Sequence, residues 1–181
     1  SSDVGNLEKR PNKTAGELVN SASPDVLVRI FREYGEEKLA HEIAGAIVVQ
    51  RTKEAITTVK QLVEIILEVY RKKTHTTKEV PWIGGLHPAT RVFQALRIAV
   101  NKELEVLEGV LPKALSLLCP GGRLAVISFH SLEDRLVKHF FKSQIGKGYR
   151  VLTKKPIVPS SEECKVNVRA RSAKLRVIEK I

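Results

Sequence analysis

The densest group of polar side chains in the sequence is Ser-Phe-His-Ser-Leu-Glu-Asp-Arg, at residues 128–135. It overlaps the end of an apolar, β-branched run at residues 123–129, a pattern that predicts a buried parallel strand. His130 closes this strand, and we expect Ser131 to cap the next helix with Asp134 as its partner. Ligands of open α/β sheets bind at the carboxyl ends of strands, and helix N-termini attract anionic or electron-rich groups. The group is therefore a candidate site, and the alternative is a capped turn around a hydrogen-bonded histidine.

A second candidate set lies on one face of the helix that is predicted to begin at His87-Pro88. Its members are three or four residues apart, so they share that face: Arg91, Gln94, Arg97 and Asn101. Guanidinium and amide groups can hold phosphates and base edges, which makes this face a candidate nucleic-acid contact. The alternative is the solvent-facing side of an ordinary amphipathic helix.

A third set alternates basic with small or apolar residues near the end of the chain: Arg169, Arg171, Lys174 and Arg176. If a strand begins at Lys174, then Lys174 and Arg176 project to one face, and Leu175 and Val177 project to the core. This set would form a basic rim beside a sheet edge. It could bind RNA or be an ordinary solvated surface.

The charge distribution also favours a polyanionic partner. The 181 residues contain 31 Lys and Arg against 20 Asp and Glu, for a formal net charge of +11. From Arg135 to the end there are 13 basic and three acidic residues, so nearly all the excess positive charge lies in the last quarter. A basic region of this kind is typical of nucleic-acid binding, and an anionic membrane is the weaker option.

Several other functions lack their sequence signals. His75, His87 and His139 stand alone, and Cys119 and Cys164 lack metal-ligand spacing, so we expect no metal site. Two distant cysteines are typical of a reducing, cytoplasmic compartment. No Gly-x-Gly-x-x-Gly or phosphate loop is present. No apolar run approaches the roughly 20 residues that span a bilayer, so we expect no membrane association.

The pattern along the chain predicts two domains. Residues 1–13 are predicted to be a mobile leader, and residues 14–70 an all-helical unit with caps at Thr14 and Ser23-Pro24. A polar stretch with Pro and Gly at residues 71–86 indicates a domain boundary.

The second predicted domain begins with a long helix from His87-Pro88. This helix is expected to break near residues 109–112, where Gly and Pro occur, and to be followed by a further helical stretch. Short strands are predicted at residues 149–152 and 175–181. Together with the run at 123–129, these elements form half of an α/β layer.

Five blocks are familiar at this point: YGEE (34–37), HPATRVFQALRI (87–98), GGRL (121–124), SFHSLEDR (128–135) and RARSAKLR (169–176). Together, across residues 14–181, they resemble the bacterial 16S rRNA cytosine-N4 methyltransferase family. The resemblance implies an α/β fold, a class I (Rossmann-like) S-adenosylmethionine-dependent core with an inserted all-helical domain. Residues 14–80 then correspond to the insertion and 81–181 to the C-terminal half of the core. The family's Gly-Gly-His loop and Asp-Leu-Gly-Val-Ser segment are not in this sequence, so no cofactor contacts are transferred.

The implied reaction joins a weak nucleophile, the cytosine amine, to a sulfonium methyl group, so it depends mainly on positioning. We expect His130 and Ser131 to be the catalytic pocket groups that orient the amine or accept its proton. Glu133 and Asp134 would cap the helix and hold Arg135. The second and third sets, with Arg135, would bind ribosomal RNA or the small ribosomal subunit.

Two alternatives to a self-sufficient enzyme remain at this point. One is a non-catalytic RNA-binding or ribosome-assembly protein that kept the substrate-side half of the fold. The other is a piece of a longer enzyme, with the missing N-terminal half or a second copy as a partner.

Overall fold

The structure is a computed structural model that describes residues 14–75 and 87–181. The predicted leader at residues 1–13 and most of the predicted boundary segment lie outside the described residues. The chain divides after Lys102 into two compact units. The sequence analysis placed the domain boundary earlier, between residues 80 and 81. No helix within the described ranges combines the length and apolar content needed to cross a membrane.

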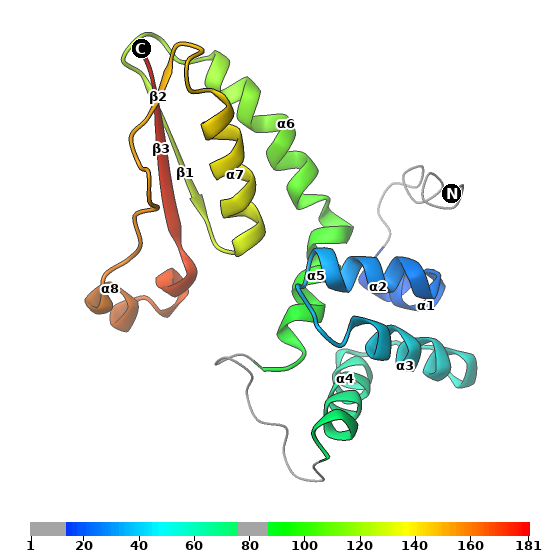
Figure 1. Cartoon of the computed structure of the whole chain (residues 1–181). Helices are drawn as coiled ribbons and strands as arrows, with labels where there is room; N and C mark the ends of the chain where they lie inside the picture. The colour runs from blue at the N-terminus through cyan, green and yellow to red at the C-terminus, as the bar shows by residue number, and fades with distance from the viewer. Residues whose placement is uncertain (1–13, 76–86) are drawn as a thin grey trace. The chain divides into compact units, whose positions relative to one another are not determined.

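The first unit is helical (Figure 1). Its helices are α1 (Ala15–Ser21), α2 (Pro24–Glu33), α3 (Ala40–Lys53), α4 (Val59–Thr74) and α5 (Thr90–Asn101). The predicted caps are confirmed: Thr14 forms a capping box with Glu17, and Ser23 caps α2 ahead of Pro24. Helix α3 begins only at Ala40, after Glu36, whose positive φ of 49° lies outside the α-helical range.

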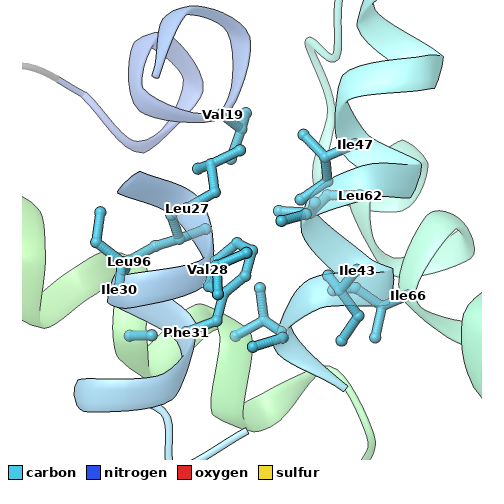
Figure 2. Packing of buried hydrophobic residues seen from close by; sticks show 14 of the residues in the cluster. Val19, Leu27, Val28, Ile30, Phe31, Ile43, Ile47, Leu62, Ile66 and Leu96 are labelled. Carbon is cyan, nitrogen blue, oxygen red and sulfur yellow. The ribbon is translucent and has the colours of Figure 1, made fainter. Parts of the chain in front are cut away.

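The core of the first unit lies between α2, α3 and α4, and α5 also packs against α2. Figure 2 shows Phe31 and Leu27 of α2 beside the isoleucines of α3 and α4. Phe31, Leu27, Ile43, Ile47 and Ile66 are all fully buried. Leu27 and Phe31, like Ile43 and Ile47, are four residues apart, which is the spacing of side chains on one buried helix face.

A buried hydrogen bond ties the segment after α2 to α4. The Tyr70 hydroxyl donates to Glu37 Oε1 over 2.8 Å, and the Leu39 amide donates to the same oxygen over 2.9 Å. Glu37 is 2% exposed. Burial, followed by the Glu37 carboxylate, raises the pKa of Tyr70 well above its usual range. The second glutamate of the YGEE block thus has a structural role in this unit.

Gly35 follows α2 and lies close to the backbone of both α2 and α5. A Cβ atom at this position would lie 2.7 Å from the Phe31 carbonyl oxygen and 2.8 Å from that of Arg91. We expect Gly35→Ala to lower the free energy of unfolding of the first unit by about 1–3 kcal/mol, because two backbone segments must separate. Gly45→Ala is the matched control. Its Cβ meets nothing within 4 Å, so in helix α3 it should stabilise slightly. Equal urea midpoints for both variants would contradict the prediction.

The second unit combines helices with a small sheet (Figure 1). Its elements are α6 (Glu103–Ser116), β1 (Arg123–Ser128), α7 (Ser131–Ser143), β2 (Tyr149–Val151), α8 (Ser161–Val166), the 3-10 helix η1 (Val168–Ser172) and β3 (Lys174–Lys180). The two short strands predicted near the end of the chain are confirmed. The predicted helix break near residues 109–112 is wrong, because α6 continues through Pro112. The break occurs at Lys102, which has a φ of 52°.

The sheet has the order β1-β3-β2, and β3 is antiparallel to both neighbours. Residues of α6, α7 and β3 form its core: Leu111, Leu115, Val137, Phe141 and Ile178. The apolar sequence of β1 predicted a strand buried on both faces, but only one face of β1 is buried. Leu124 and Val126 pack against this core, whereas Ile127 is 58% exposed. Among the described residues, β1 pairs only with β3, so its prediction as a parallel strand is also wrong for this part of the chain.

Candidate functional site

His130 is the N-cap residue of α7, and Ser131 is the first residue of the helix. The His130 backbone is extended, and its Nδ1 accepts a hydrogen bond from the Glu133 amide over 3.3 Å. Glu133 Oε2 in turn accepts from the amides of Phe129 at 2.9 Å and His130 at 3.3 Å. The expected cap of Ser131 with Asp134 is therefore wrong. The reciprocal bonds form one position earlier, where the side chains of His130 and Glu133 each accept from the backbone amide of the other residue.

The other ring nitrogen of His130 faces two carboxylates. His130 Nε2 lies 3.4 Å from Glu133 Oε1 and 3.9 Å from Glu103 Oε2, and the His130 side chain is 8% exposed. Since Nδ1 accepts an N–H, a neutral ring carries its proton on Nε2. The structure thus holds the imidazole between α6 and α7, with Nε2 buried near two carboxylates and within hydrogen-bonding geometry of neither. Sequence spacing gave no signal for Glu103, which lies on a different helix.

Glu103, His130 and Glu133 are also a potential metal-binding group, because their ligand atoms lie within 4.8 Å of one another. A metal on His130 Nε2 would need the ring proton on Nδ1. That proton would oppose the Glu133 N–H, which already donates to Nδ1. The capping bond therefore favours a proton over a metal ion at this group.

A second buried polar group lies one turn along α7. Arg176 Nε donates to Asp134 Oδ1 over 2.6 Å, and Arg176 Nη2 donates to Oδ2 over 3.2 Å. Lys174 Nζ lies 3.5 Å from Asp134 Oδ2. The Arg176 hydrogen bonds hold the pKa of Asp134 below its usual range, and Lys174 adds to this effect. Asp134 thus binds β3, whereas the sequence analysis expected it to hold Arg135, an exposed residue of α7.

The faces of β3 are the reverse of the prediction. Arg176 and Ile178 are buried, at 6% and 0% exposed, whereas Leu175 and Val177 remain partly exposed. The ion pair with Asp134 explains the reversal, because it draws Arg176 toward α7. Of the third basic set, Arg169 and Arg171 are exposed on η1, and Lys174 is half-buried. RNA contact by this set stays a prediction, and Arg169 and Arg171 are the members best placed for it.

The second candidate set lies in the first unit. Arg91 Nη1 donates to the Glu36 carbonyl over 3.1 Å, and Gln94 Nε2 donates to the Tyr34 carbonyl over 3.4 Å. These two side chains therefore brace the YGEE segment. Gln94 and Arg97 also line a pocket of about 550 Å³ together with Val63, His87, Ala89, Thr90 and Phe93. Asn101 is exposed at the end of α5. RNA binding by this set also stays a prediction.

The sequence of the whole chain decides the family. A sequence model of the MraW methylase family matches residues 6–181. The chain belongs to the MraW methylase family. The resemblance carried by the five motif blocks is thereby confirmed. The His130 cap described above lies in the SFHSLEDR block, and the Asp134–Arg176 pair joins that block to RARSAKLR.

Relatives of this MraW family chain have been named for their activity. A protein of Bdellovibrio bacteriovorus named ribosomal RNA small subunit methyltransferase H is 48% identical over 97% of this chain and 52% of its own length. Proteins with the same name from Cyanothece sp. and Coprothermobacter proteolyticus are 49% and 50% identical, over 55% and 53% of their lengths. The chain thus spans about half the length of the curated relatives it matches.

Proposed function

We propose that this chain is the substrate-side part of an enzyme that methylates a cytosine N4 in small-subunit ribosomal RNA, in the cytoplasm, with S-adenosylmethionine as the methyl donor. The observation that carries the proposal is the family match over residues 6–181. The names of the relatives and the basic C-terminal quarter support the choice of ribosomal RNA. In this proposal residues 14–80 are the helical insertion of a class I fold, and residues 81–181 are the C-terminal half of its core.

The described residues do not form the site for S-adenosylmethionine. Such a site needs acceptors for ribose hydroxyls at a strand end, and carboxylates usually supply them. Three carboxylates lie near the end of β1, and Glu103 among them faces His130 Nε2 at 3.9 Å. Glu133 accepts the amides of Phe129 and His130, and Asp134 accepts both bonds of Arg176. We therefore derive no step through the cofactor and restrict the mechanism to the residues of this chain.

Those residues can position a base. The cytosine amine needs orientation first and loses a proton after the transfer. His130 could take up another proton only by losing the bond between Nδ1 and the Glu133 amide. This favours His130 as the group that fixes the strand-to-helix turn, and Ser131, half-exposed at the first helical position, as the polar group that meets the base. The catalytic roles of both residues stay predictions.

The RNA part of the proposal is tested by Arg169→Glu combined with Arg171→Glu. Both side chains are exposed, so the fold should persist. We expect weaker binding to single-stranded ribosomal RNA, with the salt slope reduced by about 0.7 for each phosphate that the variant no longer neutralises. Lys113→Glu reverses one charge at an exposed lysine of α6 and is the control for a charge reversal away from this set. An unchanged affinity and slope for the double variant would contradict RNA binding at this site.

The enzymatic part needs the full-length protein that contains this sequence. Nuclease digestion of treated ribosomal RNA should yield N4-methylcytidine. Methyl transfer only to proteins or small molecules would contradict the proposal. The second candidate, a non-catalytic RNA-binding or assembly protein, is favoured by the engaged carboxylates at the end of β1. This candidate predicts that the protein binds RNA but transfers no methyl group. It also predicts that calorimetric titration with S-adenosylmethionine gives no heat of binding.

A further inference from the structure

The second unit has a pocket that the group around His130 does not use, and of the residues in the five motif blocks only Arg176 lines it. It has a volume of about 590 Å³ and lies among the C-terminal half of α7, the turn that follows, and β2. Phe141, Tyr149 and Val151 contribute aromatic and aliphatic surface to its wall. Lys138, Lys142 and Lys154 line the same pocket and are exposed. The pocket thus combines an apolar wall with a cationic rim.

The chain around this pocket has an unusual charge composition. Residues 135–161 contain seven Lys and Arg and no Asp or Glu. The two carboxylates on neighbouring elements are already neutralised. Glu179 is paired with Arg123 and Arg150 at 2.9 Å each, and Asp134 is paired with Arg176.

The rim lysines, by contrast, have no such counterion. No ion pair among the described residues involves Lys138, Lys142 or Lys154. Lys138 and Lys142 are four residues apart on α7, so their ammonium groups share one face of the helix. The pocket is therefore positive and lacks a counterion of its own.

We propose that this pocket binds a nucleotide of the RNA substrate, outside the group around His130. The apolar wall would pack against a base or ribose, and the three rim lysines would hold the adjoining phosphates. A bare anion would not use the apolar wall, and a neutral apolar ligand would not use the lysines. Single-stranded nucleic acid offers both features together, as phosphates next to flat bases. The inference rests on the proposed function, because it extends RNA contact to a new surface of the same chain.

The test measures RNA binding by the 181-residue chain with fluorescence anisotropy at several salt concentrations. Lys138→Glu combined with Lys142→Glu should bind a short single-stranded RNA about tenfold more weakly, with a shallower salt slope. Lys113→Glu, the exposed α6 control, should bind as the parent chain does. Circular dichroism verifies that the variants are folded. Parental affinity for the double variant would overturn the proposal.

The apolar wall needs a separate variant. Ile145 lines the pocket and is 58% exposed, so Ile145→Gln should not disturb folding. It should weaken binding to the RNA but not to an abasic strand that carries the same phosphates. Equal effects on both strands would overturn the nucleotide assignment. Cytidine monophosphate binding as tightly as the RNA, or an acidic peptide displacing the RNA from the pocket, would overturn the assignment to RNA.

The two proposals fail in distinguishable ways. If the Arg169 and Arg171 variant loses RNA and the pocket variants do not, then the pocket inference is wrong and the proposed function stands. If the parent chain itself does not bind RNA, then contact of this chain with RNA is contradicted and both proposals fail.

Discussion

Arg176→Met is expected to lower the free energy of unfolding of the second unit by about 3 kcal/mol. The guanidinium is 6% exposed and makes two hydrogen bonds to Asp134, which is itself 8% exposed. Methionine keeps much of the length of the side chain but leaves a buried carboxylate without its main partner. Breaking a buried ion pair on one side typically costs about 3–5 kcal/mol. The lower end applies here because Lys174 still lies 3.5 Å from the carboxylate.

The double variant, Asp134→Leu with Arg176→Met, is the control for this prediction. Replacing both charges with apolar groups should restore most of the loss. The pKa of Asp134 is below its ordinary value of 3.8, so the pair stabilises the fold fully above that pH and loses this contribution as the pH falls. Urea unfolding between neutral and acidic pH should therefore show a steeper acid dependence in the parent chain than in the double variant. If Arg176→Met alone has the same free energy of unfolding as the double variant, or a higher one, then the proposed role of the pair is ruled out.

The sequence predicted this site only in part. The polar density of residues 128–135 located the turn correctly, because strand-to-helix caps are local and have local signals. The partners were not local. Glu103 comes from α6 and Arg176 from β3, and neither spacing nor composition linked them to α7. The alternation of β3 did contain a usable signal, since Arg176 shares its face with the fully buried Ile178.

In the fold, too, features set by neighbouring residues were predicted, and a feature set by distant contacts was not. Caps at Thr14 and Ser23 were predicted because each needs only a few neighbouring residues. The helix break was placed at Gly and Pro, the usual local signals, and the structure has it at Lys102. Helix α6 tolerates Pro112 because Leu111 and Leu115 pack into the core on either side of it. Packing in the core, and not the local Gly and Pro signals, therefore decided where this helix break lies.

The chain of 181 residues is expected to self-associate in solution through β1. This strand lies at one end of the sheet order, and among the described residues β3 is its only partner strand. Its outer face carries Ile127, 58% exposed, and Phe129 follows it at 56% exposed. Burying one such side chain is worth about 1.5–3 kcal/mol, and an open edge offers N–H and C=O groups to a second strand. Sedimentation should therefore show dimers or larger species that increase with concentration.

Ile127→Lys tests whether β1 is the surface responsible. A lysine on an edge strand opposes pairing with another strand, so the variant should shift the population to monomer. Val106→Lys is the matched control, because Val106 on α6 is also 58% exposed and lies away from the sheet edge. Hydrogen exchange should show slower exchange of the β1 amides in the associated form of the parent chain than in the Ile127→Lys monomer. A parent chain that stays monomeric at high concentration, with strongly protected β1 amides, would mean that the chain covers this edge itself.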